Sequence, residues 1–110
     1  MTADLNDAGR LTIGGCDVVS LAEMYGTPLY VYDEHTIREM CRAFVGGFGT
    51  EYPNSHIAYS SKAFSSPALA KILEEEHVGM DVVTGGELAI ARAAEFPAPE
   101  INFHGNNKGR

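Results

Sequence analysis

The feature that most constrains the fold of this 110-residue chain is an alternation of strand and helix patterns in its second half. Short apolar runs at 56–59, 80–83 and 101–104 predict strands. Between them, Ser66-Pro67 places proline at the first position of a helix, and Thr84-Gly-Gly opens another helix. Strands and helices that alternate at this spacing are typical of a parallel sheet with right-handed crossovers. We therefore expect an α/β fold.

The first third of the chain has a different pattern, in which short strands are joined by turns. Residues 9–19 predict a hairpin, because Gly14-Gly15 can supply the positive φ angles of a tight turn. Ser20–Glu23 has the spacing of a capping box, so it predicts a brief helix that Gly26 can end. Residues 29–32, Leu-Tyr-Val-Tyr, predict a further strand.

One amphipathic helix is predicted between these two patterns, over residues 34–48 with Asp33 as its cap. Its apolar residues recur with helical spacing and share one face: Ile37, Met40, Cys41, Phe44, Val45 and Phe48. The glycines at 46–49 weaken its last turn. We interpret them as a helix exit and not as a phosphate loop, because no strand precedes them.

Charge and composition exclude several classes of partner. Acidic residues outnumber basic ones by 15 to 8, and no basic stripe is present, which argues against nucleic acid and anionic lipid as partners. No apolar run approaches the ~18 residues of a membrane span, and no secretory signal is visible. Cys16 and Cys41 form no CxxC motif and no metal-ligand spacing. We expect two free thiols, no metal site and a cytoplasmic protein.

Lys62 is the first candidate for chemistry, because it follows the strand predicted at 56–59. The carboxyl ends of strands carry the active sites of β/α proteins, and a lysine there can attack a carbonyl as an amine. The alternative is an ordinary solvated lysine. Asp81 lies in the next predicted strand, where a charge is costly unless it is paired. A cap on a neighbouring loop is the structural alternative for this residue.

Two further candidates follow the later strands. Glu87 stands at a helix start, where the helix dipole favours an acid, so a structural role explains it as well as a chemical one. His104 opens the run His-Gly-Asn-Asn-Lys108, whose residue types are also ordinary turn material. The other histidines show no mutual spacing typical of a metal site.

Four stretches together resemble the diaminopimelate decarboxylase family, pyridoxal-phosphate enzymes of the alanine-racemase-like barrel group. They occur in the family's order and spacing: YGTPLYVYD at 25–33, YSSKAF at 59–64, DVVTGGEL at 81–88 and FHGNNK at 103–108. The lysine and DVVTGGEL motifs are shared with ornithine and arginine decarboxylases. The HGNNK run is similar to diaminopimelate decarboxylases in particular.

This resemblance implies that Lys62 is the catalytic residue and forms a Schiff base with pyridoxal 5'-phosphate. It also implies a cofactor-binding set of Lys62, Asp81, Glu87, Ser60 and His104. Ser60 would lie against the cofactor ring, at a position where the family usually has alanine or proline. The implied reaction is decarboxylation of meso-2,6-diaminopimelate, a small-molecule amino-acid substrate, to L-lysine in the last step of lysine biosynthesis.

The family fold is a (β/α)8 TIM-like barrel followed by a β-rich domain. The resemblance implies that residues 1–33 supply strands that pack with that β-rich domain. Residues 34–110 would form the first part of the barrel, whose first strand ends at Lys62. A closed barrel takes about 250 residues. We therefore expect the chain to be an N-terminal fragment, inactive alone, of an enzyme that is a homodimer.

Three alternatives stay open. The first is another decarboxylase of the group, acting on ornithine, arginine or carboxynorspermidine, although the run at 104–108 argues against it. The second is a non-catalytic pyridoxal-phosphate-binding protein, which would be a single barrel and would not need the hairpin at 11–19. The third is a plain β/α scaffold without chemistry, which leaves the four matched stretches unexplained.

Overall fold

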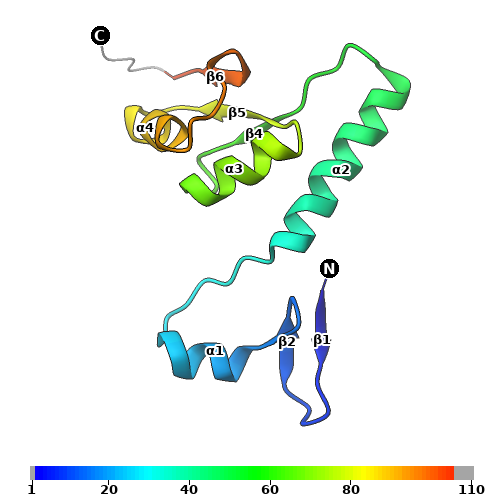
Figure 1. Ribbon diagram of the computed structural model, residues 1–110, viewed down its shortest axis with the longest axis vertical. Coiled ribbons are helices and arrows are strands. Elements are labelled where there is room, and N and C mark those ends of the chain that lie inside the picture. The colour runs from blue at the N-terminus through cyan, green and yellow to red at the C-terminus, as the bar shows by residue number, and fades with distance from the viewer. Residues whose placement is uncertain (1, 106–110) are drawn as a thin grey trace. The chain divides into compact units, whose positions relative to one another are not determined.

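The computed structural model describes residues 2–105 of the chain (Figure 1). It divides into two compact units, Met1–Met40 and Cys41–Arg110, and each is described by itself. Most of the HGNNK run that the sequence singles out, including Lys108, lies outside the described residues.

The first unit is built on a three-stranded antiparallel sheet in the order β1-β2-β3. Its strands are β1 (Ala3–Leu5), β2 (Leu11–Ile13) and β3 (Cys16–Asp17). Gly14 and Gly15 connect β2 to β3 with φ angles of 57° and 78°. The predicted hairpin is therefore confirmed over 11–17, whereas Val18 and Val19 belong to the next helix. β1 extends the hairpin by a strand that the sequence pattern did not indicate.

The helix α1 (Val18–Tyr25) begins earlier than the capping-box pattern predicts. Its N-cap is Asp17, whose carboxylate accepts hydrogen bonds from the backbone N–H groups of Val19 and Ser20 at 2.8 and 3.1 Å. Aspartate caps a helix as well as serine does, and here it comes first along the chain, so Ser20 lies inside the helix. Gly26 ends α1 with a φ of 81°, as predicted.

The strand predicted at 29–32 is wrong, because these residues have no regular secondary structure. Their side chains are exposed, including Tyr30 at 87% and Tyr32 at 51%. β-Propensity mainly measures how well a side chain packs on a partly buried sheet. No described strand pairs with this segment, so its residue types alone do not make it a strand.

The long helix α2 (Glu34–Glu51) confirms the helix predicted from Asp33 onward, but it continues through the glycines at 46–49 and ends at Glu51. Its apolar stripe is only partly covered: Met40, Phe44 and Phe48 are 52%, 50% and 47% exposed. This helix therefore presents an amphipathic face with little burial.

The second unit contains a three-stranded parallel sheet in the order β4-β5-β6. Its strands are β4 (Ala58–Ser60), β5 (Gly79–Val82) and β6 (Ile101–Phe103). The helix α3 (Pro67–Glu75) connects β4 to β5, and α4 (Gly85–Ala93) with the short 3-10 helix η1 (Ala98–Glu100) connects β5 to β6. The predicted α/β alternation is confirmed.

Both connecting helices begin where the sequence predicts. Ser66 caps α3, its Oγ accepting a hydrogen bond from the Leu69 N–H at 3.1 Å, and Pro67 is the first helical residue. Thr84 caps α4 in the same way, accepting from the Glu87 N–H at 3.2 Å. Each cap satisfies an N–H group that has no partner within its own helix.

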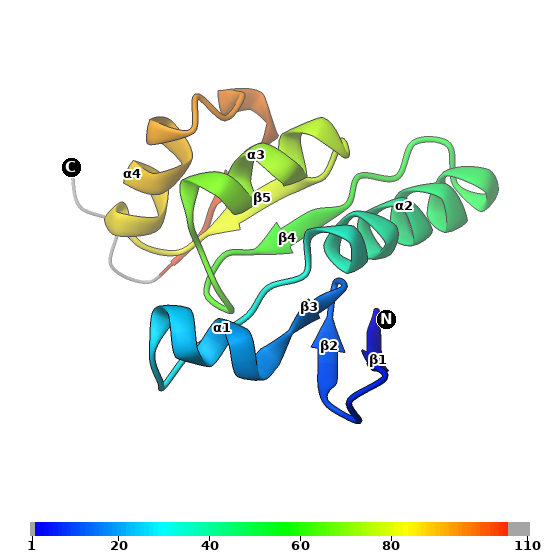
Figure 2. The same cartoon turned by 60° about the horizontal axis from the view of Figure 1, so that its bottom comes forward.

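The apolar core lies between the parallel sheet and these two helices. α3 and α4 contact each other and both contact β5, and Figure 2 shows them on the same side of the sheet. Across the described part of the chain, every buried apolar residue lies between 69 and 96: Leu69, Ala70, Leu73, Val78, Met80, Val82, Ala91 and Phe96. One face of the sheet is therefore covered by helices.

Candidate functional site

Three predicted site residues come from the carboxyl-end edge of the parallel sheet. Lys62 lies in the turn after β4, Asp81 lies within β5, and His104 directly follows β6. Backbone hydrogen bonds continue the sheet at this edge, from Ser61 N–H to the Asp81 carbonyl and from His104 N–H to the Val82 carbonyl, both at 3.0 Å. The edge where β/α proteins carry their active sites thus gathers these three residues.

The strand register places a polar row on the sheet face that lacks the helices. Ser60, Asp81 and Asn102 are register partners across the three strands. Met80 belongs to the adjacent row and is 1% exposed beneath the helices. Because successive side chains of a strand point to opposite faces, the row with Asp81 faces away from α3 and α4. Helices cover the outside of a β/α barrel, so this face corresponds to the barrel interior.

Lys62 is exposed in a turn whose shape is held by two hydrogen bonds. The Tyr59 hydroxyl donates to the Phe64 carbonyl at 2.9 Å, and the Ala63 N–H donates to the Ser60 carbonyl at 3.2 Å. An accessible primary amine on a fixed turn is what covalent attachment to an aldehyde requires. The location therefore suits an amine nucleophile, as the sequence predicts.

Asp81 and His104 are brought together across β5 and β6. Asp81 Oδ1 lies 3.4 Å from His104 Nδ1, and the two side chains are 29% and 76% exposed. Within residues 2–105 the Asp81 carboxylate accepts no backbone N–H, so it caps none of the loops in this range. Asn102, in register with Asp81, was missed by sequence reasoning. Its signal was a single polar residue between Ile and Phe in an otherwise apolar strand.

Glu87 is held at the start of α4. Its Oε2 accepts a hydrogen bond from the Val83 N–H at 2.9 Å, while its own N–H donates to the Thr84 hydroxyl. These reciprocal contacts resemble a capping box, with the carboxylate reaching one residue further back than usual. The structural explanation for Glu87 is thus supported. A carboxylate at this helix N-terminus also disfavours a phosphate there.

Ser61 is a second residue that the sequence did not single out. It lies next to Lys62 and is 2% exposed, and its hydroxyl oxygen has no hydrogen-bond partner among the residues that the structure describes. A buried hydroxyl without a partner costs free energy in an apolar environment. No periodicity in the sequence distinguishes it from its neighbour Ser60, which faces the other side of the sheet.

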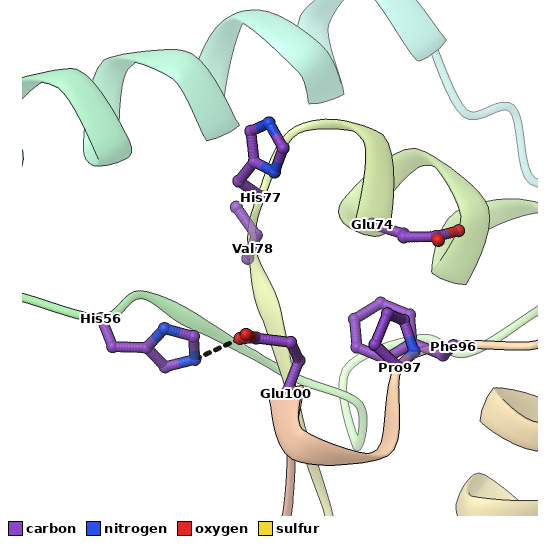
Figure 3. Close-up of a pocket in the computed structure, with 7 residues that line it drawn as sticks. All are labelled: His56, Glu74, His77, Val78, Phe96, Pro97 and Glu100. Atoms are coloured by element: carbon purple, nitrogen blue, oxygen red, sulfur yellow. Dashed lines mark ion pairs between the residues drawn. The ribbon is translucent and has the colours of Figure 1, made fainter.

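A pocket of 480 Å³ lies at the opposite edge of the sheet, near the amino ends of β5 and β6 (Figure 3). His56 Nε2 approaches Glu100 Oε2 to 3.2 Å across it. Its lining residues are His56, Glu74, His77, Val78, Phe96, Pro97 and Glu100. This edge stabilises the fold in β/α barrels, whereas the carboxyl ends carry the chemistry. We therefore assign the candidate site to the other edge.

Within residues 2–105 the structure offers neither a metal centre nor a membrane-spanning helix. No group of three or more His, Cys, Asp or Glu side chains in this range could hold a metal ion. None of its helices is long and apolar enough to cross a membrane. Neither Cys16 nor Cys41 forms a disulfide within this range.

Comparison with known proteins decides the family. Residues 34–110 match the profile of the family described as "Pyridoxal-dependent decarboxylase, pyridoxal binding domain". The chain belongs to this family. The match covers the whole α/β unit and all the predicted site residues. The predicted resemblance to a pyridoxal-dependent decarboxylase is confirmed.

Individual relatives are similar along nearly the whole chain. It is 53% identical over 109 residues to the diaminopimelate decarboxylase of Bacillus subtilis (strain 168), covering 99% of this chain and 25% of that protein. The Methanothermobacter thermautotrophicus diaminopimelate decarboxylase is 46% identical, with coverage of 94% and 24%. The chain therefore spans about a quarter of the length of these relatives.

Solved structures give the same result for the fold. The crystal structure of diaminopimelate decarboxylase from M. jannaschii in complex with L-lysine matches with a TM-score of 0.87 and 37% identity. The match covers 98% of this chain and 26% of that one. It confirms the predicted fold class, an α/β part of the pyridoxal-binding barrel.

Proposed function

We propose that this chain is part of a diaminopimelate decarboxylase, a carboxy-lyase that converts meso-2,6-diaminopimelate to L-lysine with pyridoxal 5'-phosphate. The observation that carries the proposal is the exposed Lys62 at the carboxyl edge of the sheet, with Asp81 on β5 and His104 directly after β6. The family match and the diaminopimelate decarboxylase relatives support the reaction and its substrate.

The described residues fit the aldehyde end of this cofactor. Lys62 offers an exposed amine, and Asp81 offers a carboxylate on the helix-free face. Ser60, in register with Asp81, has a small side chain that leaves room beside a flat ring. The phosphate end is not accommodated at α4, because Glu87 occupies that helix start. We therefore place the aldehyde end here, and the phosphate against residues outside 2–105.

Each of these residues then has a distinct task. The bound cofactor supplies an electron sink for the charge left on the substrate carbon when carbon dioxide departs. Lys62 would hold the cofactor through its amine, and its Nζ would hold or move a proton at this edge. Asp81 provides a carboxylate that can hold an amine at this edge by a charge-assisted hydrogen bond. Glu87 supports the site by fixing the start of α4.

We also propose that residues 1–33 pack with a β-rich domain of the longer enzyme. The exposed segment 29–32 supports this, since its Leu-Tyr-Val-Tyr sequence is suited to a strand and no described strand pairs with it. An additional strand from another domain would bury these side chains. A homodimeric, cytoplasmic enzyme is the assembly and location that we propose with it.

The test is borohydride trapping in the full-length enzyme. Borohydride should fix pyridoxal 5'-phosphate on the peptide that contains Lys62, and Lys62→Ala should abolish turnover of meso-2,6-diaminopimelate. Lys71→Ala is the matched control, because Lys71 is an exposed lysine on α3 and away from the site edge. Cofactor trapped on another lysine would overturn the site. Decarboxylation of ornithine, arginine or carboxynorspermidine in place of diaminopimelate would overturn the substrate.

A further inference from the structure

The contact between Asp81 and His104 joins a strand to the chain that leaves the neighbouring strand. His104 Nδ1 and Asp81 Oδ1 are 3.4 Å apart, a distance at which an imidazole N–H faces the carboxylate without forming a tight hydrogen bond. The pair lies on the helix-free face, in line with the polar row that contains Asn102. His104 thus belongs to the immediate surroundings of Asp81.

Backbone packing holds His104 in this place. Its N–H donates to the Val82 carbonyl at 3.0 Å, which continues the parallel ladder beyond the end of β6. The next residue is Gly105, where a Cβ atom would lie only 2.9 Å from the Val83 carbonyl oxygen. Glycine therefore allows the chain to stay close against β5. The backbone of His104 is therefore fixed against β5, which keeps its exposed imidazole within reach of Asp81.

Asp81 needs such a partner. It is a charged residue inside a parallel strand, with a side chain 29% exposed, and a partly desolvated carboxylate is costly without a compensating group. Over residues 2–105 its carboxylate has no other hydrogen bond or ion pair, so Oδ2 has no polar partner there. An imidazole N–H at Oδ1 restricts rotation of the carboxylate and leaves Oδ2 available to a ligand.

We infer that His104 is a positioning residue that acts through Asp81, holding Oδ1 so that Oδ2 faces the amine chemistry at Lys62. This deepens the function proposed above and rests on it. It differs from the expectation that His104 binds the cofactor itself. If His104 acts only through Asp81, the consequences of changing it must disappear once the Asp81 carboxylate is removed.

Two amide substitutions test whether the place of the donor nitrogen matters, or only the presence of a polar side chain at residue 104. In His104→Asn the amide nitrogen lies near the place of Nδ1, so it can still donate to Asp81. In His104→Gln the nitrogen is one carbon further away, near the place of Nε2, and it cannot take the same position. His104→Ala removes the donor altogether. His56→Ala is the matched control, because His56 pairs with Glu100 at the opposite edge, with its side chain 50% exposed.

The measurement is the rate at which full-length apoenzyme captures pyridoxal 5'-phosphate on Lys62, determined by quenching with borohydride and mass spectrometry. In capture, Lys62 Nζ attacks the aldehyde carbon and the oxygen leaves as water; borohydride then delivers the hydride that makes the bond permanent. We expect His104→Ala and His104→Gln to slow capture about three- to tenfold, the scale of an ordinary intramolecular hydrogen bond, because the 3.4 Å separation is long for a charge-assisted one. His104→Asn and His56→Ala should stay within about twofold of the parent.

The double variant Asp81→Asn/His104→Ala tests whether His104 influences cofactor capture through Asp81 or independently of it. It should capture no more slowly than Asp81→Asn alone, and the equilibrium affinity for the cofactor should not fall further. An additional loss in the double variant would show that His104 contacts the cofactor directly and would overturn the inference. A parent-like rate in His104→Ala would also overturn it while leaving the proposed function intact. A parent enzyme that captures no cofactor on Lys62 would overturn both.

Discussion

The interactions that stabilise the first unit differ from those that stabilise the second. In the second unit, α3 and α4 cover one face of a parallel sheet, and Leu73, Met80 and Val82 are at most 1% exposed. In the first unit, no residue from 2 to 40 is buried. Its short strands and α1 are joined instead by side-chain hydrogen bonds, such as those of Asp17 with Asn6 and with the start of α1.

This difference shows which part of the chain can define its own geometry. Complete burial of a large apolar side chain contributes about 1.5–3 kcal/mol to stability. Among the described residues, only the second unit contains side chains that are buried in this way. That unit also carries the candidate site. A site whose reacting groups must keep fixed positions belongs on the rigid part of a fold. The first unit offers exposed apolar residues instead, which suits a surface that another domain covers.

The largest expected effect is on the core of the second unit. Leu73→Ala removes a side chain that is 1% exposed, and we expect a loss of about 2–5 kcal/mol in the free energy of unfolding. Lys71→Ala, on the same helix with a side chain 57% exposed, is the matched control and should change stability little. Urea unfolding of the full-length enzyme measures both. Equal effects would contradict the location of the core.

A smaller effect is expected where α2 joins the same unit. Arg42 donates from Nε and Nη2 to the two carboxylate oxygens of Glu76, both at 2.7 Å, and the Glu76 side chain is only 8% exposed. Arg42→Ala leaves a buried carboxylate poorly compensated, at a cost of about 1–3 kcal/mol. Arg42→Lys should cost nearly as much, because it keeps the charge but loses the paired geometry.

The control for this pair is a second substitution. Glu76→Gln removes the buried charge, so adding it to Arg42→Ala should recover part of the lost stability in the same urea experiment. If the double variant is less stable than Arg42→Ala by the full cost of Glu76→Gln alone, the two side chains are independent. The contact would then contribute only packing, and the second unit would rest on its apolar core alone.

The sequence predicts the second unit better than the first. The β/α alternation, both connecting helices and the positions of Lys62 and Asp81 were predictable, because caps and apolar runs act locally and burial agrees with them. The strand at 29–32 was not, because a strand also needs a partner and none is described for it. The start of α1 was missed because Asp17 competes with Ser20 for the same capping role.

The candidate site was predictable as a set of residues but not as a set of contacts. Lys62, Asp81 and His104 follow from motifs at strand ends, whereas the pairing of Asp81 with His104 depends on strand register. Register is fixed by long-range backbone pairing, which no local pattern encodes. The sequence allowed both a chemical and a structural role for Glu87. The hydrogen bond from the Val83 N–H to its carboxylate, which the sequence does not reveal, supports the structural role.

The smallest effect concerns the first unit and its dependence on charge. The backbone N–H of Ser20, more than any other favourable contact, lowers the pKa of Asp17 below its usual value of 3.8. A carboxyl whose pKa is lower in the folded state stabilises the fold above its unfolded pKa and loses that contribution as the pH falls through the folded pKa. We therefore expect the start of α1 to loosen only below about pH 4.

Amide chemical shifts in the 110-residue chain test this directly, since Val19 and Ser20 donate to the Asp17 carboxylate. Both amides should titrate together with a midpoint below 3.8. Asp17→Asn should abolish the titration and keep a neutral cap. The Leu69 amide is the internal control in the second unit, because the non-titrating Ser66 hydroxyl caps it. A midpoint at or above 3.8 would mean that these contacts do not hold α1 in solution. The first unit would then not be ordered by its own hydrogen bonds, which would sharpen the contrast between the two units.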